Sequence, residues 1–197
     1  MSTGRIRSPF SFSHRFRRLV WSVVYVSLFR PVPRACFSWR RLLLVLFGAR
    51  IEATARVYGT ARIWTPWNLA MGPRSVLGDA VDCYNVAMVT LEEGAIVSQY
   101  AYLCTAGHDI HDPGFGLTFA PITLKRQSWV CAKAIVGMGV TVGEGAVVAL
   151  GAVAVESVVP WAVVGGNPAR EIGKRSPCGV RVDDGGRERV GSGHVRQ

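Results

Sequence analysis

Hydrophobic and small residues recur along much of this chain with a period of six. Residues 130–153 read VCAKAI, VGMGVT, VGEGAV and VALGAV, so each group of six begins with valine, has a small residue at its second place and has alanine or valine at its fifth. Such a period fits neither an α-helix nor one long strand. It is typical of a parallel β-solenoid, in which each hexad forms one short face and the first residues of successive coils stack into a continuous core.

The same period is present upstream of this run. Hexads begin at residue 51, are interrupted between residues 72 and 90, and resume at residue 91 with a shift of two residues. Because three hexads make one triangular coil, residues 51–175 are expected to form one solenoid domain of mainly β structure. The apolar residues that set the phase are Ile51, Val57, Ile63, Leu69, Leu91, Val97 and Leu103.

The period stops after His108 and restarts at Leu124, in the phase that Val130 inherits. Residues 109–123 are therefore predicted to be a loop that leaves the solenoid wall. Long excursions from a compact scaffold usually carry function.

The first 50 residues follow another pattern, in which arginines precede short apolar runs. The run LVWSVVYVSLF at 19–29 has eleven residues, whereas a bilayer-spanning helix needs about 20, and Pro31 and Pro33 separate it from LLLVLF at 42–47. We expect two short helices with cationic and apolar faces. These helices would cap the open first coil, rest on an anionic membrane surface through residues 1–45, or do both.

The two ends of the chain bear on the cellular location of the protein and on which segments are ordered. The segment PVPRACF at 31–37 lacks the small-x-small cleavage site of a secretory signal. We therefore expect a cytoplasmic protein, with peripheral contact at the inner membrane face. The tail 176–197 has little apolar surface to bury and is expected to be disordered.

Charge and cysteine content narrow the class of protein. The chain has 197 residues and a formal net charge of +10; its first 50 residues contain ten arginines and no acid, while the rest is balanced. Those arginines alternate with aliphatic residues instead of forming a groove-reading motif, so no nucleic-acid partner is expected. The five cysteines form no CxxC pair, which favours a reducing compartment.

His108 is the residue most suited to catalysis. It ends a regular hexad, so a rigid wall would hold its backbone while the loop that starts at Asp109 flanks its imidazole. Histidine exchanges protons near neutral pH and suits proton abstraction from a hydroxyl. A zinc site would need three or four ligands, but His108 and His111 are the only histidines in the solenoid, so no metal is expected.

Two further groups of polar residues have a functional and a structural interpretation. Asp82, Tyr84 and Asn85 interrupt an apolar wall, either as a ledge that faces a sugar or as ordinary turn residues. Arg170 and Lys174 follow the last coil, either facing an anionic ligand that runs down the wall or forming a solvated basic end.

Residues 51–175 resemble the hexapeptide-repeat O-acetyltransferases of the galactoside and maltose acetyltransferase group. The resemblance depends on the hexads, TAGHD at 105–109, PITL at 121–124 before SWV at 128–130, and VVGGNPAREI at 163–172. The segments WRRLLLVLFGARI at 39–51, CYN at 83–85 and YLCTAGHD at 102–109 are most similar to acetyltransferases of colanic acid and related exopolysaccharide clusters.

The resemblance implies a left-handed parallel β-helix that assembles as a homotrimer, with each site shared between subunits. It implies acetyl-CoA as the acyl donor and a sugar or lipid-linked oligosaccharide as the acceptor. His108 falls on the family's general base, and Asp82 and Asn85 fall near its acceptor-binding patch. The positions that fall on the wall lining acetyl-CoA are Ala132, Leu150, Val155 and Arg170.

Direct transfer within a ternary complex would need no covalent intermediate, because proximity of the two substrates does much of the work. Cys104 is a conceivable nucleophile, but its place in a wall hexad favours packing. A scaffold solenoid without activity, another acyl donor and an amine acceptor remain alternatives.

Overall fold

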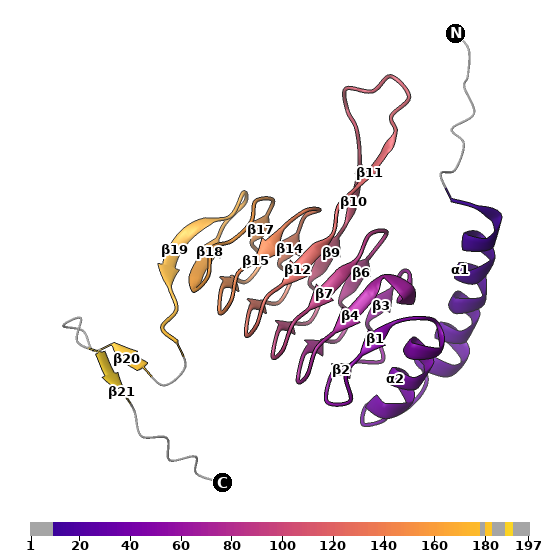
Figure 1. Ribbon diagram of the computed structural model, residues 1–197, viewed down its shortest axis with the longest axis horizontal. Helices are drawn as coiled ribbons and strands as arrows, with labels where there is room; N and C mark the ends of the chain where they lie inside the picture. The colour runs from indigo at the N-terminus through magenta and orange to yellow at the C-terminus, as the bar shows by residue number, and fades with distance from the viewer. Residues whose placement is uncertain (1–9, 178–179, 183–187, 191–197) are drawn as a thin grey trace.

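The computed structural model describes residues 10–177, 180–182 and 188–190. Most of these residues form one parallel β-solenoid, with helices at its N-terminal end and a hairpin that projects from its wall (Figure 1). Three parallel sheets make up the three walls, and each coil contributes one short strand to each wall.

The first wall consists of β1 (Arg50–Ile51), β4 (Leu69–Met71), β7 (Val89–Leu91), β12 (Ile122–Leu124) and β15 (Thr141–Val142). The second consists of β2 (Arg56–Val57), β5 (Val76–Leu77), β8 (Ile96–Val97), β13 (Trp129–Val130), β16 (Val147–Val148) and β18 (Ala162–Gly165), with β19 (Arg170–Lys174) antiparallel at its end. The third consists of β3 (Arg62–Ile63), β6 (Asp82–Tyr84), β9 (Tyr102–Cys104), β14 (Ile135–Val136) and β17 (Val153–Ala154).

The core follows the predicted hexads. The first-place valines Val130, Val136, Val142 and Val148 are completely buried, and the fifth-place alanines pack beside them. Small side chains at the fifth place let the chain turn a corner without a cavity, because an alanine methyl fills the angle between two walls.

The interruption predicted between residues 72 and 90 is wrong. Leu77 and Cys83 continue the six-residue period from Met71, and all three are buried. The phase changes because Leu69 and Met71, and again Val89 and Leu91, lie at both ends of one strand and point into the core. Two such steps of two residues bring the six-residue period to the phase of Leu91. The early coils are therefore two residues longer than the later ones, as the partners Arg50↔Ala70 and Thr123↔Thr141 show.

The excursion is a β-hairpin and differs from the loop predicted for residues 109–123. β10 (Ala106–His108) pairs antiparallel with β11 (Leu117–Phe119), and the backbone N–H of Ala120 donates to the Thr105 carbonyl at the base, 3.0 Å away. The hairpin stands away from the coils (Figure 1). Strand β12 then re-enters the first wall, so the predicted loop ends too late.

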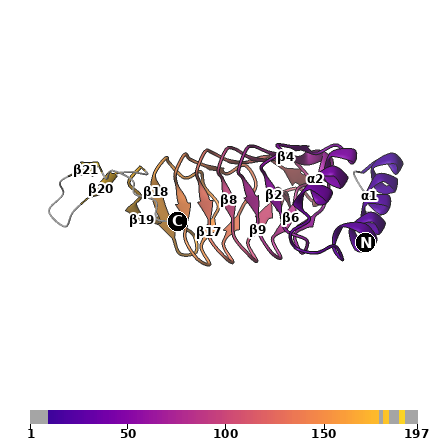
Figure 2. The ribbon, with the colours of Figure 1, turned by 90° about the horizontal axis from the view of Figure 1, so that it is seen from below.

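Helices α1 (Phe12–Val24) and α2 (Phe37–Leu46), joined through a π-helical turn η1 (Tyr25–Phe29), lie at the N-terminal end of the solenoid (Figure 2). A short 3₁₀ turn, η2 (Pro66–Asn68), lies in the corner between β3 of the third wall and β4 of the first wall. Buried Trp21, Phe29 and Leu44 join the solenoid core, so the helices cap the first coil. Within the described part of the chain, no helix has the length and apolar content needed to cross a bilayer.

Buried Arg40 holds the linker between the two helices. Its guanidinium donates to the carbonyl oxygens of Arg34, 2.9 Å away, and Pro33, 2.8 Å away. These bonds pair backbone acceptors that would otherwise lack partners where the chain turns back.

Of the tail 176–197, the structure describes residues 176–177 and two short antiparallel strands, β20 (Val180–Val182) and β21 (Glu188–Val190). These strands differ from the disorder that we expected there. Residues 178–179, 183–187 and 191–197 lie outside the described residues, as do residues 1–9 of the N-terminal segment.

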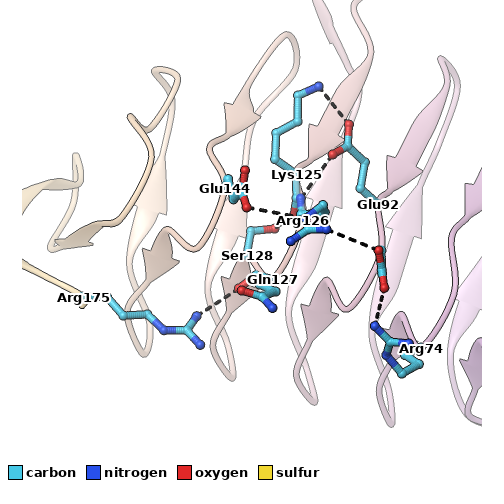
Figure 3. A network of polar contacts seen from close by, with 9 residues as sticks. Arg74, Glu92, Lys125, Arg126, Gln127, Ser128, Glu144 and Arg175 are labelled. Carbon is cyan, nitrogen blue, oxygen red and sulfur yellow. Dashed lines mark hydrogen bonds and ion pairs between the residues drawn. The ribbon is translucent and has the colours of Figure 1, made fainter. Parts of the chain in front are cut away.

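An ion-pair network connects successive coils along one edge (Figure 3). Arg126 contacts Glu93 at 3.6 Å and Glu144 at 3.4 Å, and Lys125 contacts Glu92 at 2.8 Å. Exposed pairs of this kind contribute less than about 1 kcal/mol each. Beside these ion pairs, Arg175 donates a hydrogen bond to the Gln127 carbonyl, 2.9 Å away. This bond holds the segment that follows the last coil against the solenoid.

Gly145 and Gly151 provide a matched test of corner packing. Both have positive φ angles, +64° and +67°, but a Cβ at Gly145 would lie 2.4 Å from the Trp161 ring, whereas a Cβ at Gly151 would meet nothing within 4 Å. We expect Gly145→Ala to lower the free energy of unfolding by about 1–3 kcal/mol more than Gly151→Ala, because only the first overpacks its corner. Denaturant unfolding of both variants measures the difference, and equal losses would contradict it.

Candidate functional site

His108 lies at the outer end of β10, with an exposed side chain. Its Nδ1 is 2.8 Å from the carbonyl oxygen of Phe115, and its ring stacks on the Phe115 ring with centroids 4.7 Å apart. A carbonyl oxygen can only accept, so Nδ1 carries the hydrogen of the neutral ring. Nε2 therefore keeps its lone pair, which is the form that a general base needs.

The turn of the hairpin presents Phe115 to His108. The Asp112 carboxylate accepts hydrogen bonds from the backbone N–H groups of Gly114, at 2.8 Å, and Gly116, at 3.1 Å. Phe115 between them adopts a left-handed φ of +48°, which costs free energy for a bulky residue and is sustained by its surroundings. Sequence reasoning missed Asp112 and Phe115, although the DPGFG segment is a recognisable turn signal.

Asp109, predicted to contact the substrate, takes part in the same turn. Its Oδ1 accepts a hydrogen bond from the His111 backbone N–H at 2.9 Å. Asp109 is exposed beside His108.

Among residues 10–177 and the two described tail strands, no group of three histidine, cysteine or acidic side chains could hold a metal ion.

Asp82 and Tyr84 lie on β6, on the outer side of the third wall. Asp82 forms an ion pair with Arg62 at 3.5 Å, and the Tyr84 ring meets the Trp64 ring edge to face, with centroids 5.2 Å apart. A cavity of about 300 Å³ lies between this wall and helix α1. Its lining includes Arg18, Tyr25, Arg62, Trp64 and Asp82.

The structure corrects the assignment of Asn85 to the acceptor patch. Asn85 is fully buried; its Oδ1 accepts from the Thr65 N–H at 2.9 Å, and its Nδ2 donates to the carbonyls of Thr65, at 2.7 Å, and Asn68, at 3.0 Å. Both polar atoms of this amide are hydrogen-bonded, and they join the corner after β6 to the corner between β3 and β4 in the neighbouring coil. No polar atom of the side chain is left for a sugar.

Cys104 is half-buried on β9, and its thiol donates to the Ala106 carbonyl at 3.2 Å. Burial, together with a hydrogen bond to Cys104, raises the pKa of the neighbouring Tyr102 phenol. The contacts of Cys104 are thus those of a packed wall residue.

The predicted donor-binding residues lie on the later coils. Ala132 and Leu150 occupy equivalent corners of neighbouring coils, and the Gly151 N–H donates to the Ala132 carbonyl at 3.1 Å. Leu150 and Val155 are apolar but largely exposed. A cavity of about 190 Å³ is lined by the two chain neighbours of Val155, Ala154 and Glu156, and by residues that include Ala162, Ala169 and Arg170.

The two basic residues predicted for this wall are separated. Arg170 and Lys174 lie at opposite ends of β19, where they pair with Gly165 and Ala162 respectively. Because β19 has a β-bulge between these pairs, their partners are only three residues apart on β18, so roughly 10 Å separates the two backbones at about 3.4 Å per residue. This separation lets the two side chains face two different groups of one extended anionic ligand.

Comparison with known proteins adds to this geometry. No protein-family model matches the chain. The chain is 33% identical over 156 residues to WcaF of Escherichia coli, whose name assigns it to colanic acid biosynthesis as an acetyltransferase; the match covers 79% of this chain and 86% of WcaF. It is 28% identical over 96 residues to the galactoside O-acetyltransferase of the same organism, covering 47% and 45% of the two chains.

Two solved structures share the fold. A hexapeptide-repeat acetyltransferase from Vibrio cholerae, complexed with acetyl-CoA, has a TM-score of 0.74 at 19% identity and covers 86% of this chain and 93% of its own. A galactoside acetyltransferase in complex with coenzyme A has a TM-score of 0.75 at 19% identity, with 86% of each chain covered. The predicted fold class, a left-handed parallel β-helix, is confirmed.

Proposed function

Since this chain belongs to the hexapeptide-repeat acetyltransferases, in the group that contains WcaF, and is therefore an acetyl-CoA-dependent transferase, we propose that it acetylates a sugar hydroxyl of an exopolysaccharide precursor. The observation that carries the proposal is the hydrogen bond from His108 Nδ1 to the Phe115 carbonyl. That bond leaves Nε2 free and outward, where a substrate hydroxyl can reach it.

The proposed reaction is one direct transfer. His108 Nε2 takes the proton of the sugar hydroxyl while that oxygen attacks the thioester carbonyl carbon; the C–S bond then breaks, and the imidazolium returns the proton to the leaving CoA sulfur. The Phe115 carbonyl stabilises the positive ring during transfer, since it accepts a hydrogen bond from Nδ1. General-base catalysis of this kind contributes about 10²–10⁴-fold.

The acceptor would lie along the third wall. Asp82 offers a carboxylate for sugar hydroxyls, and Tyr84 and Trp64 offer aromatic surface beside the cavity of about 300 Å³. Asp109 would complete this side beside His108, beyond the outer end of β10. A ring of polar and aromatic side chains suits a sugar, which has hydroxyl edges and apolar faces.

The donor would lie along the later coils. Exposed Leu150 and Val155, with Ala132 beside them, give an apolar surface for the pantetheine arm, and main-chain groups can bind its amides. Arg170, whose ion pair with Glu156 is long at 4.0 Å, is the better placed of the two cations for a CoA phosphate. Lys174 would serve a more distant one.

We further propose that the enzyme is a homotrimer. His108 is exposed on one chain alone, and catalysis in a site open to bulk water would lose much of its electrostatic benefit. A neighbouring subunit packed against the hairpin would supply the missing wall.

Acetyl-CoA as donor and the free thiols of Cys36, Cys83, Cys104 and Cys131 support the expected cytoplasmic location.

The test is release of free CoA when the full chain is incubated with acetyl-CoA and a panel of bacterial exopolysaccharide repeat units. We expect acceptor-dependent release above the rate of thioester hydrolysis, with mass spectrometry detecting an acetyl ester on the glycan. Calorimetry with CoA distinguishes the scaffold alternative, because a scaffold would bind none. Amide formation on an amino sugar, without ester formation, would overturn the hydroxyl acceptor.

A further inference from the structure

Helix α1, with the first residues of the turn η1 that continues it, presents an apolar stripe to the outside of the molecule. The five residues of this outer stripe, with exposed fractions from 57% to 77%, are Phe12, Phe16, Leu19, Val23 and Val26. They are spaced four, three, four and three residues apart, which places them on one side of a helix. An amphipathic helix normally buries such a stripe, so this one lacks the partner that its pattern requires within the described chain.

The opposite face of α1 is fixed to the solenoid. Trp21 is buried and its Nε1 donates to the Ile63 carbonyl at 2.7 Å. The guanidinium of Arg17 lies 4.2 Å from the centre of the Trp67 ring, and that of Arg18 lies 3.8 Å from the centre of the Trp64 ring. Turning the stripe inward would break the Trp21 bond and both cation–π contacts, so its outward direction is built into the fold.

Helix α2 also has exposed apolar residues. Trp39, Leu42, Val45 and Leu46 are exposed on one side of this helix. The Trp39 Nε1 donates to the carbonyl of exposed Leu28 at 2.9 Å, which joins α2 to the turn η1. Tryptophan with one polar and one apolar edge is favoured where lipid meets water.

The charge around the outer stripe identifies what covers it. Arg15 lines a shallow groove with Phe12, Phe16 and Leu19, and the sequence contains no acidic residue before Glu52. A second copy packed stripe to stripe would bring the Arg15 side chains of the two helices together, with no acid on either helix to neutralise them. Anionic lipid headgroups neutralise those charges and also admit the apolar side chains.

We propose that the outer stripe of α1 lies in the interface of an anionic phospholipid bilayer, with the helix parallel to the membrane and the solenoid outside it. This membrane contact is separate from the acetyl-transfer chemistry. It requires no spanning segment, since the apolar side chains of an interfacial helix enter only about 5–10 Å. It would keep the acceptor-binding wall next to α1 close to lipid-linked glycans.

The test is sedimentation of the full chain with sucrose-loaded vesicles, made either of phosphatidylcholine alone or with one third phosphatidylglycerol. We expect binding to the anionic vesicles, weaker binding to the neutral ones, and weakening at high salt. The double variant Phe16→Ser/Leu19→Ser should bind the anionic vesicles at least about 10-fold more weakly, because two large apolar side chains no longer enter the interface.

The matched control is Val159→Ser/Ile172→Ser, which removes two comparably exposed apolar side chains far from α1 and from the hairpin in the sequence and should bind vesicles like the unchanged protein. Failure of the unchanged protein to sediment with anionic vesicles would overturn the proposal. So would equal binding by the two double variants, or a stripe variant that changes only the oligomer mass in light scattering. Release of CoA with a water-soluble acceptor should be the same for the stripe variant, so failure here is distinct from failure of the proposed reaction.

Discussion

Replacing His108 with alanine should lower the kcat of acetyl transfer by about 10²–10⁴-fold. The loss follows from the geometry. Nδ1 of the ring donates a hydrogen bond to the Phe115 carbonyl, 2.8 Å away, so Nε2 carries the lone pair that accepts the substrate proton. The His108 side chain is exposed, so the melting temperature and oligomer mass should not change. Acceptor-dependent CoA release, measured with saturating acetyl-CoA, gives the comparison.

His111→Ala is the control for this variant. His111 lies in the same hairpin, and its backbone N–H rather than its ring bonds Asp109, so its removal should leave turnover within about two-fold of the original. Full turnover by the His108 variant would reject the general-base mechanism. Equal loss in both variants would instead assign the effect to the hairpin's shape.

Replacing Asn85 with alanine should destabilise the protein by about 3 kcal/mol. The change removes the Asn85 partner of the buried Thr65 N–H and of the Asn68 carbonyl, and leaves the Thr65 carbonyl with only the Asn68 N–H. Each group left without a partner costs about 1–3 kcal/mol. Chemical denaturation measures the effect. At low denaturant, where the variant stays folded, the KM for the acceptor should be unchanged.

Asp82→Ala should show the opposite pattern. Its ion pair with Arg62, 3.5 Å long, joins two largely exposed side chains and contributes less than about 1 kcal/mol. We therefore expect little change in stability and a higher KM for the acceptor. A stability loss in Asp82→Ala as large as that in Asn85→Ala would argue that both residues only hold the wall together.

The regular part of the fold could be predicted because the solenoid repeats its side-chain requirements. Val136 and Val142 occupy equivalent buried places, so composition at fixed spacing reveals them. The coils around Leu77 were missed because Leu69 and Met71 both point inward and move the phase by two residues within one strand. A search for constant spacing along the sequence does not detect such a step.

The site was only partly predictable, for a different reason. His108 stood out by its side-chain chemistry and its place beside the excursion. Phe115 orients it through a main-chain carbonyl, which every residue has, so the DPGFG turn signal alone could not assign this role to Phe115. Asn85 was misassigned because its partners, Thr65 and Asn68, belong to another coil, and a polar side chain that is fully paired looks in sequence like one that awaits a ligand.

The hairpin leaves and rejoins the wall at adjoining points, because Ala120 bonds back to Thr105. Residues can therefore be added to or lost from its tip without altering the alignment of any strand above or below it. A single deletion inside a coil would instead exchange inward and outward side chains along that strand. Evolution is thus free to vary length at the rim beside His108, where acceptor preference can diverge between homologues. The coils accept only changes that keep inward and outward side chains in place, such as the two extra residues of the early coils.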